Sequence, residues 1–242
     1  MPIRGTMARM HRRLAALPAF ALFMAAVPAR ASQPLVTDDA ALVPSNTCQL
    51  EAWFRPSNDS REYWAQPACN FTGNLELALG GATARPTDGE ASSIIALQAK
   101  TLIVPREDRD WSLGVIAGAG RDTGEPHGSS AFQTYGARAL ASWYPRGNLE
   151  IDVNLGVANT YGAGTFVFAG AAAQYAVVTR LQLLAEVFHD QPGSGKYQVG
   201  FRYLVVPNRF EAYVSYGNQL NGTAGQWSAI VGIRLQSPPV LP

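Results

Sequence analysis

The strongest constraint on this chain is a two-residue alternation of apolar and polar side chains that recurs from Thr47 almost to the C-terminus. In residues 149–157, Leu, Ile and Val occupy the odd positions, whereas Glu150, Asp152 and Asn154 occupy even ones. A period of two is typical of a β-strand whose two faces meet different surroundings. The chain is therefore predicted to be all-β.

Twelve segments of this kind are separated by turn-forming residues rather than by helical patterns. Their predicted bounds are 47–56, 61–71, 74–83, 91–104, 109–121, 131–145, 148–158, 165–177, 180–189, 195–205, 208–217 and 225–235. Tight turns such as Arg146-Gly147 alternate with mostly longer loops such as 122–130 and 159–164. This alternation is typical of up-and-down barrels of outer membranes, which have short periplasmic turns and longer outer loops.

The apolar face of these strands is predicted to point outward. A soluble barrel needs an apolar interior, but here a mostly aliphatic face lies opposite a face that carries charges. No helical segment is left to cover so much apolar sheet, so lipid is the expected cover. The prediction is a single up-and-down antiparallel transmembrane β-barrel of about 12 strands over residues 47–236. Its expected partners are outer-membrane lipid and the outer-membrane assembly machinery.

Aromatic residues of the apolar face cluster near strand ends, where amphipathic rings meet lipid headgroups. Those next to the short turns are Phe71, Trp111, Trp143, Tyr175, Tyr203 and Phe210. Those next to the outer loops are Phe54, Tyr63, Tyr135, Tyr216 and Trp227. Two girdles of this kind favour a membrane barrel, because strand propensity alone does not select a face or an end.

Residues 1–31 have the organisation of a secretory signal peptide, with cleavage expected after Ala31. Basic residues precede an apolar run, Leu14–Val27, which is shorter than the roughly 20 residues that a membrane helix needs. Residues 32–46 are then a periplasmic N-terminal segment and residues 237–242 a C-terminal tail. The expected location is the outer membrane of a Gram-negative bacterium. Without residues 1–31 the chain has 14 basic and 18 acidic residues, a net charge of −4 that does not favour nucleic acid.

The two cysteines, Cys48 and Cys69, fit a single hairpin register. If Asn58 and Asp59 form the centre of the turn, this register pairs Cys48 with Cys69, Trp53 with Trp64, Phe54 with Tyr63, and Arg55 with Glu62. An exported chain permits a disulfide here, and two unpaired buried thiols are the alternative. Pro67 lies within the second strand and lacks a ladder donor, so we expect a bulge or a local break there.

The same parity places six acidic and four basic side chains inside the barrel: Glu51, Glu76, Lys100, Arg138, Glu150, Asp152, Glu186, Arg202, Glu211 and Arg234. Charges of both signs in a narrow lumen favour a structural network of ion pairs. The functional alternative is a narrow polar passage or solute site. On that reading, room on the wall is left by Gly136, Gly156, Gly170, Gly200 and Gly232.

No catalytic, cofactor or metal site is expected. Beyond residue 31 the chain has only two histidines, His127 and His189, and neither lies in a pattern that supplies both a nucleophile and an orienting partner. Two distant histidines do not suit a metal site. The Gly-rich stretches 114–120 and 162–170 lack the following helix and lysine of a phosphate-binding loop. The chain is therefore interpreted as a non-enzyme.

Residues 33–40, Gln-Pro-Leu-Val-Thr-Asp-Asp-Ala, followed by Gln49-Leu50-Glu51, resemble the opening of the meta-pathway phenol-degradation proteins, a family of outer-membrane transporter-like barrels. The resemblance implies an outer-membrane barrel that helps the uptake of hydrophobic or aromatic compounds, and it supplies no catalytic residues. Many such barrels end on an aromatic residue that the assembly machinery reads, whereas this chain continues past Leu235 to Pro242.

The stretch Pro34–Asp39 precedes the first strand and carries two adjacent carboxylates. We expect it either to fold into the periplasmic mouth and meet Arg138, Arg202 or Arg234, or to be a solvated tail. The predicted function is that of a transporter or channel-like barrel for small solutes, hydrophobic or aromatic ones among them. The alternatives are a closed structural or adhesive barrel without transport and a soluble periplasmic ligand-binding barrel.

Overall fold

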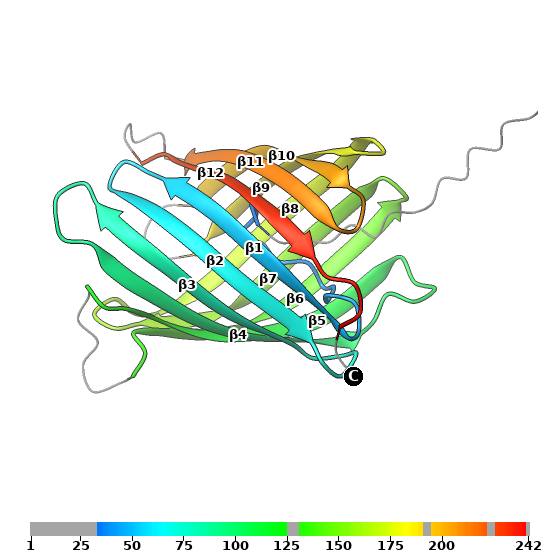
Figure 1. Ribbon diagram of the computed structural model, residues 1–242, viewed down its shortest axis with the longest axis horizontal. Coiled ribbons are helices and arrows are strands. Elements are labelled where there is room, and N and C mark those ends of the chain that lie inside the picture. Colours follow the sequence, from blue (N-terminus) through cyan, green and yellow to red (C-terminus); the bar gives the residue numbers. More distant parts are fainter. Residues whose placement is uncertain (1–32, 125–130, 191–194, 222–225, 241–242) are drawn as a thin grey trace, which may run out of the picture.

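The computed structural model describes residues 33–124, 131–190, 195–221 and 226–240. The predicted signal peptide and His127 lie outside these residues. The described strands form one closed antiparallel barrel in which each strand pairs with its sequence neighbours and β1 closes on β12 (Figure 1). The strands are β1 (Thr47–Pro56), β2 (Ser60–Asn70), β3 (Glu76–Pro86), β4 (Ser92–Val104), β5 (Trp111–Asp122), β6 (Thr134–Arg146), β7 (Leu149–Thr160), β8 (Gly164–Val178), β9 (Leu181–His189), β10 (Lys196–Val206), β11 (Phe210–Gln219) and β12 (Ser228–Gln236).

All twelve predicted strands are confirmed, with every bound within three residues of the prediction. The end of the barrel that carries the 147–148 and 179–180 turns is called the short-turn end, and the opposite end the long-loop end. One loop differs from expectation, because β7 and β8 continue until only residues 161–163 separate them. This tight turn uses Gly162 and Gly164 at φ of 84° and 80°, a region that favours glycine.

The predicted inside-out alternation is present. On the outer face, Leu79 and Leu155 are 52% and 59% exposed, whereas Glu150 and Asp152 on the inner face are 1% and 0% exposed. Of the eleven predicted girdle aromatics, nine are exposed, and Phe54 and Phe210 are half-buried. Exposed apolar side chains on this scale need a cover other than water. No helix within the described residues is long and apolar enough to cross a membrane.

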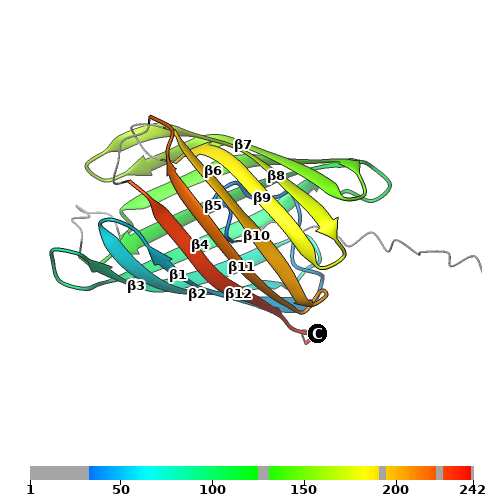
Figure 2. The same ribbon diagram turned by 90° about the horizontal axis from the view of Figure 1, so that it is seen from above.

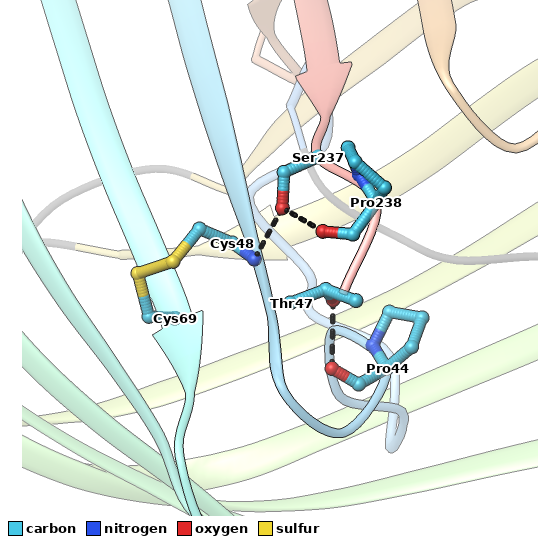
Figure 3. The surroundings of a disulfide bond; sticks show 6 residues. All are labelled: Pro44, Thr47, Cys48, Cys69, Ser237 and Pro238. Carbon is cyan, nitrogen blue, oxygen red and sulfur yellow. Dashed lines mark hydrogen bonds between the residues drawn. A yellow bond between two sulfur atoms is a disulfide. The ribbon is translucent and has the colours of Figure 1, made fainter. Parts of the chain in front are cut away.

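The first hairpin has the predicted register. Cys48 lies opposite Cys69 and forms a disulfide with it, on the same face of β1 as the exposed Leu50 (Figure 3). Pro67 stays paired with Leu50 of β1, so the expected bulge does not occur. The ladder between β2 and β3 omits Gln66 and Pro67 and resumes in the same register, which is the local break expected of a residue without a backbone N–H.

The residues after β12 fold against the start of β1. The Ser237 N–H donates to the Cys48 carbonyl at 2.8 Å, and the Cys48 N–H donates to the Ser237 hydroxyl at 3.0 Å. The second of these bonds is drawn in Figure 3. The Val240 N–H donates to the Asn46 carbonyl at 2.9 Å. The described part of the predicted C-terminal tail therefore extends the pairing of β12 with β1.

Candidate functional site

Residues 33–46, called the lumen segment, lie inside the ring of strands, where Figure 2 shows them in blue. The side chains of Leu35, Thr37, Asp39 and Val43 are buried, with Thr37 at 0% exposure. Leu35 packs against Ala172 and Leu184 of the wall. The solvated tail is therefore wrong. The stretch enters the barrel, as the alternative predicted, but reaches past the periplasmic mouth to Glu186 and Gln198.

Residues 36–38 of the lumen segment are held by β9 and β7. The carboxylate of Glu186 accepts hydrogen bonds from the backbone N–H of Val36 at 2.9 Å and of Thr37 at 2.8 Å. The Asn154 amide binds Asp38 in both directions: its oxygen accepts from the backbone N–H at 2.8 Å, and its nitrogen donates to the carbonyl at 2.7 Å. These contacts place the segment across the middle of the barrel.

The part that leads into β1 is held nearer the short-turn end. The Ala40 N–H donates to Ser142 at 2.7 Å, and Ser142 donates in turn to Asp152 at 2.6 Å. Asp152 also accepts from Gln174 of β8 at 3.0 Å. Two further contacts fix Val43: its N–H donates to Glu76 at 2.7 Å, and its carbonyl accepts from Asn70 at 2.8 Å.

Basic and amide side chains of the wall bind carbonyls of the lumen segment. Arg138 donates to Val36 at 3.2 Å and also lies over the Phe168 ring, 4.3 Å from its centroid. Arg202 donates to the carbonyl of Gln33 at 3.3 Å, and Gln198 donates to that of Pro34. These groups are buried or half-buried, so the segment satisfies wall donors that would otherwise lose partners away from water.

The carboxylates of the lumen segment bind a different cation from those expected. Lys100 of β4 lies 2.8 Å from Asp39 and 3.5 Å from Asp38. The stretch 34–39 meets Arg138, as expected, but through a backbone carbonyl, whereas its two carboxylates lie beside Lys100 of β4. Arg138 and Arg202 reach the segment at earlier residues and bind its carbonyls instead.

A second cluster of charged side chains lies on the four neighbouring strands β10, β11, β12 and β1. Glu211 of β11 pairs with Arg234 of β12 and lies 3.6 Å from Arg202 of β10. Arg202 also donates to Gln174 at 3.1 Å. Glu51 of β1 stands opposite Arg234 in the sheet register. Acids and bases of neighbouring strands thus face one another inside the barrel, as the mixed charge of the inner face indicated.

The ten predicted inner-face residues differ in how deeply they are buried. Eight are buried: Glu51, Lys100, Glu150, Asp152, Glu186, Arg202, Glu211 and Arg234. Glu76 and Arg138 are half-buried, and both contact the lumen segment. The described residues contain no group of three or more His, Cys, Asp and Glu side chains placed to hold a metal ion.

The pairing of Trp53 with Trp64 was predicted, but not the aromatic cluster that the two residues form inside the barrel. Trp53 and Trp64 stack with ring centroids 5.3 Å apart, and Tyr213 and Ile230 pack with them. Trp64 donates to Glu62 at 2.7 Å, and Glu62 also pairs with Arg55 at 2.5 Å. The signal was available, because Trp53 shares the parity of Glu51.

Two of the five wall glycines make room for a side chain in the lumen. A Cβ at Gly170 would lie 2.4 Å from the Thr37 hydroxyl, and one at Gly232 would lie 2.6 Å from the Tyr213 hydroxyl. The nearest atoms to a Cβ at the other three are backbone atoms of a neighbouring strand; these are Gly136, Gly156 and Gly200. At these three positions the lack of a side chain allows neighbouring strands to pack closely, rather than making room in the lumen.

A cavity of about 220 Å³ remains between the lumen segment and the wall. On β1 it extends from Gln49, near the short-turn end, to Arg55, near the long-loop end. Its lining is mostly polar and includes Gln66, Gln98 and Arg138. The geometry is that of a small, polar space beside a chain segment that lies inside the barrel.

The fold and the lumen define a porin-like β-barrel. The KdgM porin, solved in complex with disordered oligogalacturonate, superposes with a TM-score of 0.59 at 11% identity, over 77% of this chain and 98% of that one. The NanC porin gives 0.57 at 10% identity, over 78% and 98%. At such identities the likeness shows the fold. The chain belongs to the family described as Uncharacterised conserved protein UCP029691, whose model matches residues 19–236. No curated protein sequence matches it.

Proposed function

We propose that this protein is a channel-like outer-membrane barrel for small solutes, and that its own N-terminal segment narrows the passage. The observation that carries the proposal is the polar cavity of about 220 Å³ that runs beside the lumen segment along β1. The porin-like fold supports it. No reaction is assigned. The polar side chains inside the barrel line the passage and bind the lumen segment.

The outer-membrane location is supported by the outer surface of the barrel. Aliphatic residues cover the middle of the strands, and exposed aromatic residues such as Trp111 and Tyr135 lie near opposite ends. This distribution suits a bilayer, whose headgroup layers favour amphipathic rings. The partners of the proposal are therefore outer-membrane lipid and the outer-membrane assembly machinery, with residues 1–31 as the export signal.

The size of the solute is limited by the lumen segment. The cavity is smaller than the roughly 300–1,000 Å³ of a site for a drug-sized ligand. The KdgM porin, of similar fold, was solved in complex with a disordered oligogalacturonate. The space beside the segment in this barrel is small and is lined by acids as well as bases, so such an oligomer is not the solute that we propose. The proposal is a small solute, of about one ring or fewer.

Two classes of small solute have support. Hydrophobic or aromatic compounds are implied by the resemblance of residues 33–40 to the phenol-degradation proteins, and the stacked Trp53 and Trp64 offer aromatic surface inside the barrel. Small polar solutes are favoured by the polar lining of the cavity. We place phenol-like compounds first, because they combine an aromatic ring with a group that can hydrogen-bond.

Uptake into liposomes tests the proposal. Vesicles that contain the refolded barrel should take up phenol and glycerol faster than empty vesicles, and planar bilayers should show small discrete conductance steps. A ratio of phenol to glycerol uptake above that of empty vesicles supports the aromatic class. Vesicles that behave like empty ones with both solutes would overturn the channel and support the closed structural or adhesive barrel instead.

A further inference from the structure

The lumen segment is bound mainly through its backbone. Between residues 33 and 43, five N–H groups donate to side chains of the barrel wall: those of Val36, Thr37, Asp38, Ala40 and Val43. Five carbonyls accept from wall side chains: those of Gln33, Pro34, Val36, Asp38 and Val43. Backbone groups are common to all peptides, so the wall is complementary to a bent peptide backbone rather than to one sequence.

Selectivity comes from two places along the segment. Lys100 pairs with the adjacent carboxylates of Asp38 and Asp39, and no other side chain of residues 33–43 forms a salt bridge with the described wall. Gly170 leaves space for the side chain of Thr37. A peptide with two neighbouring acidic residues after a small residue therefore fits the wall best.

The wall groups that bind the segment need a ligand of this kind. Glu186, Asn154 and Ser142 come from three different strands and point at consecutive parts of one backbone. A buried polar group that loses its partner is destabilised, because it is also kept away from water. A lumen built only to pass solutes does not require such alignment along a peptide.

We propose that the lumen wall is a peptide-binding site that residues 33–43 occupy within the same chain, and that it accepts in their place a short peptide that follows the same bent path and has two adjacent carboxylates. This inference deepens the proposed function and rests on it for its consequence, which is that exchange of the segment for a peptide regulates the passage. Because the segment is tethered, its effective concentration reaches the millimolar range, and an external peptide must compete with it.

The test measures binding of a fluorescent peptide with the sequence of residues 33–43 to the full-length barrel in detergent, by anisotropy. In one variant, Gly and Ser replace residues 34–42 at unchanged length, so the site is vacated. Saturable binding to this variant is expected, at least tenfold tighter than to the wild type. A peptide carrying Asp38→Asn and Asp39→Asn should bind the variant at least tenfold more weakly than the unchanged peptide.

Two wall substitutions in the same variant locate the site. Lys100→Gln should weaken peptide binding at least tenfold, and Arg61→Gln, an exposed basic residue of β2, should leave it unchanged. Heat-modifiable gel migration shows that each protein is folded. If the Gly and Ser variant does not fold, the full-length D38N/D39N variant replaces it in the same assay.

Equal binding to the wild type and the variant, or no binding to a folded variant, would overturn the peptide site. Conductance is recorded separately, so the two proposals fail in different ways. A barrel that conducts but binds no peptide overturns only the peptide site. A barrel that binds the peptide but never conducts overturns only the channel.

Discussion

Lys100 and Asp39 form an ion pair inside the barrel, with 2.8 Å between Nζ and Oδ1 and side chains only 6% and 1% exposed. One partner lies on β4, and the other precedes the first strand. The pair therefore couples the wall to the segment that fills the lumen. Because both charges are buried, removal of one deprives the other of its shortest ion pair.

Lys100→Met should lower the free energy of unfolding by about 3–5 kcal/mol, the range for breaking a buried pair. Urea titration of the barrel in lipid vesicles measures this change. The double variant K100M/D39N should recover part of the loss. Lys196→Gln, which breaks a more exposed pair with Asp190, should cost about 1 kcal/mol or less. Equal effects of the two lysine substitutions would contradict the role of the lumen pair.

Gly170→Ala should displace the lumen segment, because the new Cβ would lie 2.4 Å from the Thr37 hydroxyl. The expected result is faster protease cleavage within residues 33–46 and a conductance at least twofold above that of the wild type. Adding Thr37→Ala removes the clashing oxygen and should restore both properties. Gly81→Ala is the control, since nothing lies within 4 Å of its Cβ. The idea is lost if G170A and G81A cannot be distinguished.

Trp64→Ala should open the half of the lumen near the long-loop end, because it removes one ring of the stack with Trp53 and the contact with Glu62. Conductance should rise, and the barrel should lose less than the about 3–5 kcal/mol of a fully buried Trp→Ala change, because Trp64 is half-buried. Tyr63→Ala provides the comparison on the lipid face of the same strand. It should leave conductance unchanged, and a rise equal to that of W64A would argue against a lumen role.

Reduction of the disulfide between Cys48 and Cys69 should destabilise the barrel by about 3 kcal/mol, the loop-entropy value for a separation of this order. The disulfide fixes β1 to β2 where the lumen segment enters the wall and where Ser237 binds Cys48. Urea midpoints with and without reductant measure the effect. The C48S/C69S variant should be insensitive to reductant, and a wild type equally insensitive would show that the bridge is not formed.

The strands could be predicted from the sequence because strand periodicity is local: each segment alternates according to what its two faces meet. The pairing of Cys48 with Cys69 followed in the same way, since a short turn fixes the register of a hairpin. The inner face was predicted from parity alone, without knowledge of which strands become neighbours.

The contents of the lumen depended on the tertiary structure. Val36 binds Glu186, 150 residues away in the sequence, and Lys100 binds Asp39 across 61 residues. No local pattern encodes such distances, so the sequence left open whether the N-terminal segment entered the barrel and did not predict that Lys100 pairs with its carboxylates. The sequence by itself determined the strands, their faces and the first hairpin. Closure of the barrel decided the rest, because only a closed wall brings side chains of distant strands around one backbone.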